Sequence, residues 1–96
     1  MSTPYEAHGN LGASGDTTVD NTAQNRWARV RVYNADTVNH TITWKKGSTP
    51  LKQTVLTAKD SDEFGPVYLP SGTNIVVNNA EATTTTAPTY DDNGSY

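Results

Sequence analysis

The stretch Trp27–Asn34, WARVRVYN, decides the fold that this chain can adopt. Ala28, Val30 and Val32 alternate with two arginines and a tyrosine, so the aliphatic side chains fall on one face of an extended backbone. This pattern is typical of a β-strand with one buried face. The arginines then face solvent or a partner.

A second run with the same period follows a short polar turn. The turn is residues 34–37, and the run is Val38–Lys45. One face of this run carries Val38, His40, Ile42 and Trp44. The two runs are predicted to form a hairpin. Because large apolar residues are scarce elsewhere, Trp44 is expected to fill the core.

Weaker strand signals continue beyond a second turn at residues 46–50. They are Leu51–Leu56, Phe64–Leu69 and Asn74–Asn78, with residues 57–63 read as a polar loop. Pro66 interrupts the second of these runs, and proline inside a run indicates an edge strand or a bulged strand. No segment carries a helical period.

These signals predict an all-β fold. Strands and turns at this spacing favour a small antiparallel β-sandwich, immunoglobulin-like in type, or a partly open barrel. The patterned core spans residues 26–79. Residues 1–25 and 80–96 are rich in Thr, Asn, Ser, Ala and Gly, and they are predicted to be extended N- and C-terminal arms. Removing residues 1–20 or 83–96 is expected to leave the β-fold intact.

Length and composition limit how stable such a core can be alone. The chain has 96 residues and no cysteine, so it has neither disulfides nor a thiolate metal site. A core of this size contributes only about 3 to 5 kcal/mol. Oligomerisation or docking on a larger body is therefore expected.

Charge is unevenly distributed along the chain. All 7 Lys and Arg residues lie between Arg26 and Lys59, where Asp36 is the one acidic residue, and both flanks are acidic. The flanks are expected to lie across the basic segment of the same subunit or of a neighbour, which would orient assembly more than add affinity. The alternative is a solvated surface without a partner.

Catalytic chemistry finds little support. His8 lies in an arm and His40 in a predicted strand, where it is best read as a sheet residue. The acidic run 60–63 lacks the spacing of a calcium loop, and Asp91 and Asp92 are isolated in a tail. We expect no catalytic, cofactor or metal site, and a protein that is not an enzyme.

Two partner classes are also disfavoured. Arginines near Trp27 and Tyr33 could bind nucleic acid, but the sequence pI of about 5.1 and the acidic flanks argue against such binding. An acidic protein surface fits the same residues better. The chain begins without the features of a signal peptide and has no stretch that could cross a bilayer, so synthesis in the cytosol and no membrane partner are expected.

Aromatic and arginine side chains are the expected contacts with a partner, because they provide large contact area at low entropic cost. The candidate interface consists of Tyr5, Trp27, Arg29, Arg31, Tyr33 and Tyr90.

The runs Trp27–Trp44 and Phe64–Val77 resemble the small β-sandwich virion proteins of tailed bacteriophages, in particular capsid decoration or cement proteins. The segment LPSGT at residues 69–73 also occurs in immunoglobulin-like and fibronectin-like modules of bacterial surface proteins. The phage resemblance implies a homo-oligomer, often a trimer, on the capsid exterior. It also implies binding to the major capsid protein, bridging of capsid subunits, and synthesis in the host cytoplasm.

Two other functions stay open at this point. One is a neck or tail accessory protein of the same virion. The other is a carbohydrate-binding adhesive module, which requires an exposed aromatic platform. Its members would be Trp27, Tyr33, Trp44 and Tyr68.

Overall fold

The computed structural model of the chain describes residues 3–96, and these form strands, turns and loops without any helix. The strands are β1 (Pro4–Asn10), β2 (Gly15–Asp20), β3 (Arg26–Tyr33), β4 (His40–Lys46), β5 (Thr49–Leu56), β6 (Ser61–Leu69), β7 (Ile75–Asn79) and β8 (Thr89–Ser95). Within this range there is accordingly no helix that could cross a membrane.

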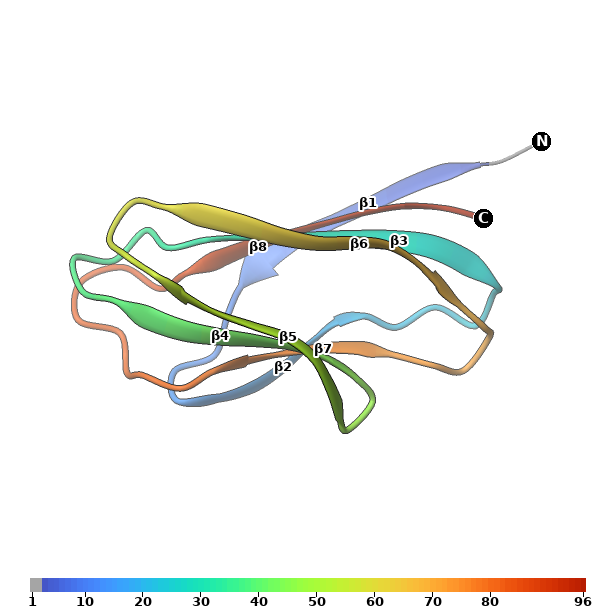
Figure 1. Cartoon of the computed structure of the whole chain (residues 1–96). Helices are drawn as coiled ribbons and strands as arrows, with labels where there is room; N and C mark the ends of the chain where they lie inside the picture. The colour runs from blue at the N-terminus through green and yellow to red at the C-terminus, as the bar shows by residue number, and fades with distance from the viewer. Residues whose placement is uncertain (1–2) are drawn as a thin grey trace.

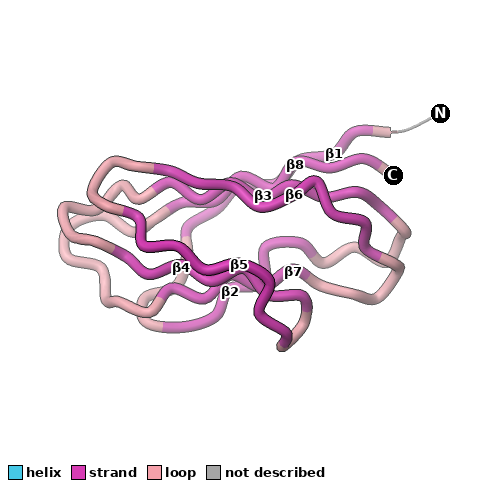
Figure 2. The backbone as a smooth tube through the Cα atoms, viewed as in Figure 1, coloured by secondary structure: helices cyan, strands magenta, loops and turns pink. Residues whose placement is uncertain are grey.

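Two antiparallel sheets lie one over the other (Figure 1). Sheet A has the order β1-β8-β3-β6, and sheet B has the order β2-β7-β4-β5. The connections run over the two ends of the sandwich (Figure 2). The all-β sandwich predicted from the sequence is confirmed.

The strand order is that of a jelly roll. Along residues 3–96, only β4 and β5 are consecutive strands that pair with each other, and every other connection crosses from one sheet to the opposite one. An immunoglobulin-like sandwich instead pairs several consecutive strands within a sheet. A jelly roll consists of eight strands in two sheets, connected as two Greek keys.

The core forms where the inward faces of the two sheets meet. In β3 burial alternates strictly, with Ala28, Val30 and Val32 inside and their neighbours outside. Trp44 is fully buried, as predicted, and its indole Nε1 donates to the carbonyl oxygen of Val30 at 3.2 Å. Further buried apolar residues are Leu11, Val19, Ile42, Leu56, Leu69, Ile75 and Val77.

The predicted hairpin of residues 27–34 and 38–45 is wrong. These runs are β3 and β4, which lie in different sheets and face each other across the core. The Asn34 side chain explains the crossing, because its Nδ2 donates to the carbonyl oxygens of Val38 at 2.8 Å and of Leu56 at 2.9 Å. These bonds fix residues 34–39 as a connection over the end of the sandwich.

The predicted arms are extended, but they are folded into the sandwich. Residues 1–25 carry β1 and β2, and residues 80–96 carry β8. β8 lies between β1 and β3, and β2 pairs with β7. Sequence patterning missed these strands because they bury few apolar side chains, and backbone ladders hold them in place.

The prediction for Pro66 is confirmed. β6 is an edge strand of sheet A, and its register with β3 shifts between Ala28 and Val30. The Gly65-Pro66 bond is cis, and Gly65 has φ 114°, a conformation that glycine tolerates. β6 begins earlier than expected, because Ser61–Glu63 belongs to the strand rather than to a loop.

Removing residues 89–96 should unfold the protein, because β8 is a central strand and its loss leaves β1 without a partner and opens sheet A. Deleting Tyr96 alone is the matched control and should preserve the fold, since its backbone N–H makes one hydrogen bond, to Thr3 at 3.0 Å. Far-ultraviolet circular dichroism measures both. A folded 1–88 chain would contradict this role for β8.

Candidate interaction surface

The outward residues of β3 form an exposed strip on sheet A. Trp27, Arg29, Arg31 and Tyr33 all point to solvent, because they alternate with the buried residues of the same strand. Four of the six predicted interface residues are therefore brought together. Trp27 is 53% exposed, which is high for a side chain of this size.

A further aromatic residue joins the strip from the neighbouring strand. Tyr68 of β6 lies opposite Trp27, and the two rings make an edge contact with centroids 5.6 Å apart. Tyr68 is 44% exposed. Its place in the strip follows from strand register, which periodicity alone does not reveal. We call Trp27, Arg29, Arg31, Tyr33 and Tyr68 the β3 face.

The two arginines of the β3 face have different surroundings. Arg31 lies opposite Glu63 on β6 and Asp91 on β8, and its Nη2 donates to Ser61 Oγ at 3.1 Å. Arg29 instead lies opposite Asn93, beside Trp27 in the strand. The positions opposite Arg31 are thus acidic, whereas the position opposite Arg29 is not, so the end of the strand near Trp27 is the more positive one.

Tyr5 and Tyr90 lie on the other side of sheet A, away from the β3 face. The Tyr5 ring covers Gly94 and the Tyr90 ring covers Gly9, and neither glycine position has room for a side chain. Tyr90 packs against the core, and Tyr5 stacks on Tyr96 with centroids 4.8 Å apart. These two tyrosines hold β1 and β8 in place, so they do not extend the strip.

One buried polar cluster joins four strands. The Arg26 guanidinium donates to Asp20 Oδ1 from Nε at 2.9 Å and from Nη2 at 2.5 Å, and both side chains are fully buried. Tyr5 donates to Asp20 Oδ2 at 2.6 Å. Arg26 also binds the carbonyl oxygens of Gln24, Pro70 and Thr73, which ties down two loops at this end of the sandwich.

Asp92 of β8 completes this cluster. It is almost fully buried, and its Oδ1 has no hydrogen-bond partner. Burial, together with the hydrogen bond and the charge of Asp20, raises the pKa of Asp92 to about 8. This shift favours the neutral form of Asp92, which can donate to the Asp20 carboxylate. The same contact, with the bonds from Tyr5 and Arg26, offsets burial and lowers the pKa of Asp20.

A second buried cluster surrounds His40, at the other end of the sandwich. His40 Nε2 is 2.8 Å from Asp36 Oδ2, and its Nδ1 is 2.7 Å from Asn79 Oδ1. Asn79 uses its Nδ2 to donate to Gly12, so its oxygen faces the histidine. Both ring nitrogens therefore meet acceptors, an arrangement that favours the imidazolium form of His40. Burial opposes the charge, yet these hydrogen bonds raise the pKa of His40 above its usual value.

Asp36 fastens the long β7–β8 connection to this cluster. Its carboxylate accepts the backbone N–H groups of Thr84 and Thr85 at 2.8 Å each, and the Thr85 hydroxyl at 2.9 Å. The hydrogen bond from Thr84 is the largest of several contributions that hold the pKa of Asp36 far below its usual range. The four threonines at residues 83–86 are thus an ordered loop.

Neither cluster has the arrangement of an active site. His40 is inaccessible, with both ring nitrogens already bonded, so it cannot accept a proton from a substrate. Across residues 3–96 no three His, Cys, Asp or Glu side chains are grouped as metal ligands. His40 is a sheet residue, as predicted.

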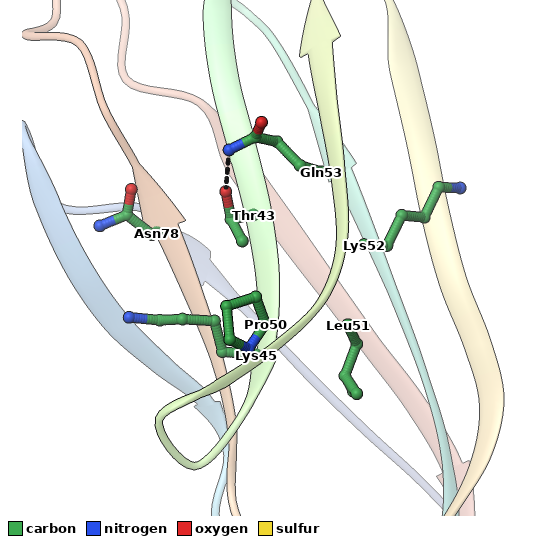
Figure 3. A pocket seen from close by; sticks show the side chains of 7 residues that line it. All are labelled: Thr43, Lys45, Pro50, Leu51, Lys52, Gln53 and Asn78. Carbon is green, nitrogen blue, oxygen red and sulfur yellow. Dashed lines mark hydrogen bonds between the residues drawn. The ribbon is translucent and has the colours of Figure 1, made fainter.

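A shallow hollow lies on the outer face of sheet B (Figure 3). Gln53 Nε2 donates to Thr43 Oγ1 at 2.9 Å across its floor, and Lys45 pairs with Asp16 at 2.9 Å. Lys52 points away from the hollow and pairs with Asp62 of β6 at 3.0 Å. The remaining lining residues are Pro50, Leu51 and Asn78. None of the residues that line the hollow is aromatic.

Comparison with known proteins identifies the fold. No family model matches the chain, and no curated protein matches it significantly. A structure titled "Bacillus endospore appendages form a novel family of disulfide-linked pili" matches with a TM-score of 0.60 and 14% identity, covering 100% of this chain and 86% of that one. PirA matches with a TM-score of 0.56 and 13% identity, covering 96% and 94%.

A structure of the extra small virus of the prawn Macrobrachium rosenbergii matches at 10% identity with a TM-score of 0.49, covering 98% of this chain and 77% of that one. At these identities the first two matches show the fold alone, a small all-β sandwich.

Asp92 should make stability depend on pH. An acid whose pKa is raised on folding stabilises the folded state fully below its unfolded pKa of about 3.9, and that stability is lost as pH rises to about 8. Asp92→Asn keeps a donor for Asp20 without the charge. Between pH 6 and pH 9, denaturant titrations should show a smaller loss of unfolding free energy for Asp92→Asn than for wild type. Parallel pH profiles would contradict the buried proton.

Asp36→Asn should loosen the β7–β8 connection, because an amide cannot accept the full set of N–H donors and pairs poorly with an imidazolium. We expect faster hydrogen exchange at the amides of Thr84 and Thr85 and a lower unfolding midpoint. Asp60→Asn is the control, since the Asp60 carboxylate accepts a single exposed N–H, from Ser61 at 2.8 Å. Unchanged exchange at both threonines would show that Asp36 does not hold the loop.

Proposed function

We propose that this chain is a non-enzymatic structural subunit of a virion, which decorates a bacteriophage capsid and bridges its subunits. The observation that carries the proposal is the β3 face. Trp27 and Tyr33 are exposed beside two arginines on β3, and Tyr68 is exposed next to them on β6. This composition is typical of residues that dominate protein interfaces.

The rest of the molecule supports a structural role. The buried charged groups tie strands and loops together, and the accessible hollow on sheet B is shallow and open. The jelly roll is an architecture found in capsid proteins. The match to endospore pili adds a second case of this kind of sandwich in an assembled structure.

The proposed partner is the major capsid protein, through an acidic surface that meets the positive end of the β3 face at Arg29. A homo-oligomer on the particle, a trimer by the phage resemblance, would place several such faces together. Multiple copies that bind only the assembled shell then stabilise it by mass action.

The pilus match supports one alternative, a subunit of an extracellular fibre. The subunits of that relative are described as disulfide-linked, whereas this chain has no cysteine and would have to assemble without such links. The carbohydrate-binding alternative is weakened, because Trp44, one of the four residues expected in its aromatic platform, is buried.

The test uses particles of the encoding phage with and without this protein. Decoration should raise the temperature at which the particles disrupt, and the copy number should approach that of the major capsid protein. Trp27→Ala should weaken particle binding by about 30-fold, which corresponds to ~2 kcal/mol. Val55→Ala, which truncates an exposed side chain on sheet B, is the control.

Identical disruption temperatures with and without the protein would overturn the cementing role. A copy number matching a single ring would instead indicate a neck or tail protein.

A further inference from the structure

The four edge strands of the sandwich are not equally open to pairing. An open edge exposes unpaired backbone N–H and C=O groups that can bind another strand. β5 and β6 are bridged by Lys52, whose Nζ donates to the Glu63 carbonyl oxygen at 3.0 Å. Each of these two strands also carries a proline and a register shift. β2 is interrupted near Asp20, which turns into the buried cluster.

β1 is the regular edge. It pairs with β8 at seven consecutive positions, from Pro4 opposite Ser95 to Asn10 opposite Thr89, without any shift. Its other side has no neighbouring strand in sheet A. The start of β1 and the end of β8 lie side by side at one end of the molecule (Figure 1).

Hydrogen bonds at its two ends show which backbone groups of β1 are free. The Tyr96 N–H donates to the Thr3 carbonyl oxygen at 3.0 Å, and the Leu11 N–H donates to the Pro88 carbonyl oxygen at 2.8 Å. Backbone N–H and C=O groups point to alternate edges along a strand, so those of the odd-numbered residues of β1 point toward β8. The backbone groups of Glu6, His8 and Asn10 therefore point to the open edge.

The side chains along this edge are complementary to a second copy of the same strand. Glu6 and His8 are exposed on the same face, with side chains 65% and 58% accessible. His8 Nδ1 lies 2.5 Å from Asp91 Oδ1, and this hydrogen bond raises the pKa of His8. If two copies of β1 pair antiparallel about Ala7, Glu6 of each copy lies opposite His8 of the other.

Charge selects this register over its neighbours. A shift by two residues in one direction places Glu6 opposite Glu6, and a shift in the other direction places His8 opposite His8. Like charges directly opposite each other destabilise a pair of strands. In the register centred on Ala7, the free backbone groups of Glu6 in one copy also meet those of His8 in the other as a hydrogen-bonded pair. Tyr5 of one copy then lies opposite Gly9 of the other, which has no side chain.

We propose that two copies of this chain associate through β1, with a two-fold axis at Ala7, so that their A sheets join into one continuous sheet. Such an interface uses the same patch on both subunits, as two-fold symmetry requires. The inference stands independently of the proposed function, because it rests on the edge strand and not on the β3 face.

The test measures solution mass by sedimentation or light scattering of the full chain. The wild-type assembly should have twice the mass of the assembly formed by variants in which β1 cannot pair. Glu6→Lys and His8→Glu each place like charges opposite one another, and each should weaken pairing by about tenfold or more. Lys46→Glu, a charge reversal far from β1, should keep the wild-type mass.

Mixing the two variants provides the decisive control. Lys at position 6 of one chain then faces Glu at position 8 of the other, while His8 of the first faces Glu6 of the second, so the double mass should return. If His8→Glu fails to fold by circular dichroism, His8→Pro removes the same outward N–H while leaving the ladder to β8 intact.

Wild type with the same mass as the variants would overturn the proposal. So would variants that keep the wild-type mass, or a mixture that fails to recover it.

Discussion

Sheet A is complete only when the last strand of the chain enters between the first strand and β3. β8 supplies hydrogen-bond partners to both of its neighbours, so the backbone groups of β1, and those of β3 on the edge that faces β8, lack partners without it. The buried cluster of Asp20, Arg26, Asp92 and Tyr5 sits at this junction and takes one residue from each of β1, β2, β3 and β8. The sandwich thus depends on contacts between the two ends of its sequence.

Much of the central sheet structure could be predicted from the sequence. Period-two alternation located β3 and β4, and the position of Pro66 indicated an edge strand. Alternation tells which residues face inward, but it does not tell which sheet a strand joins. That choice depends on how the connection crosses the end of the sandwich, which here is fixed by the side chain of Asn34.

The terminal strands escaped prediction for a different reason. Their inward positions include Gly9 and Gly94, which are covered by tyrosine rings, so no aliphatic stripe marks them. One feature of the sequence does indicate the buried charged cluster. Arg26 is in phase with Ala28 and Val30, and an arginine at an inward position requires a carboxylate partner. For the candidate surface, the alternation in β3 correctly groups its outward residues. Tyr5 and Tyr90 were misplaced because the terminal segments that carry them were expected to lie outside the fold.

The position of β8 also has a consequence for synthesis. A ribosome releases the chain from its first residue onward, so β1 emerges long before the strand that will pair with it in sheet A. Until β8 leaves the exit tunnel, the nascent protein has β1 unpaired and one hydrogen-bonding edge of β3 without its neighbouring strand. Contacts so distant in sequence are slow to form. Sheet A therefore closes only after β8 has emerged, and until then its exposed strands are at their most prone to associate with other chains.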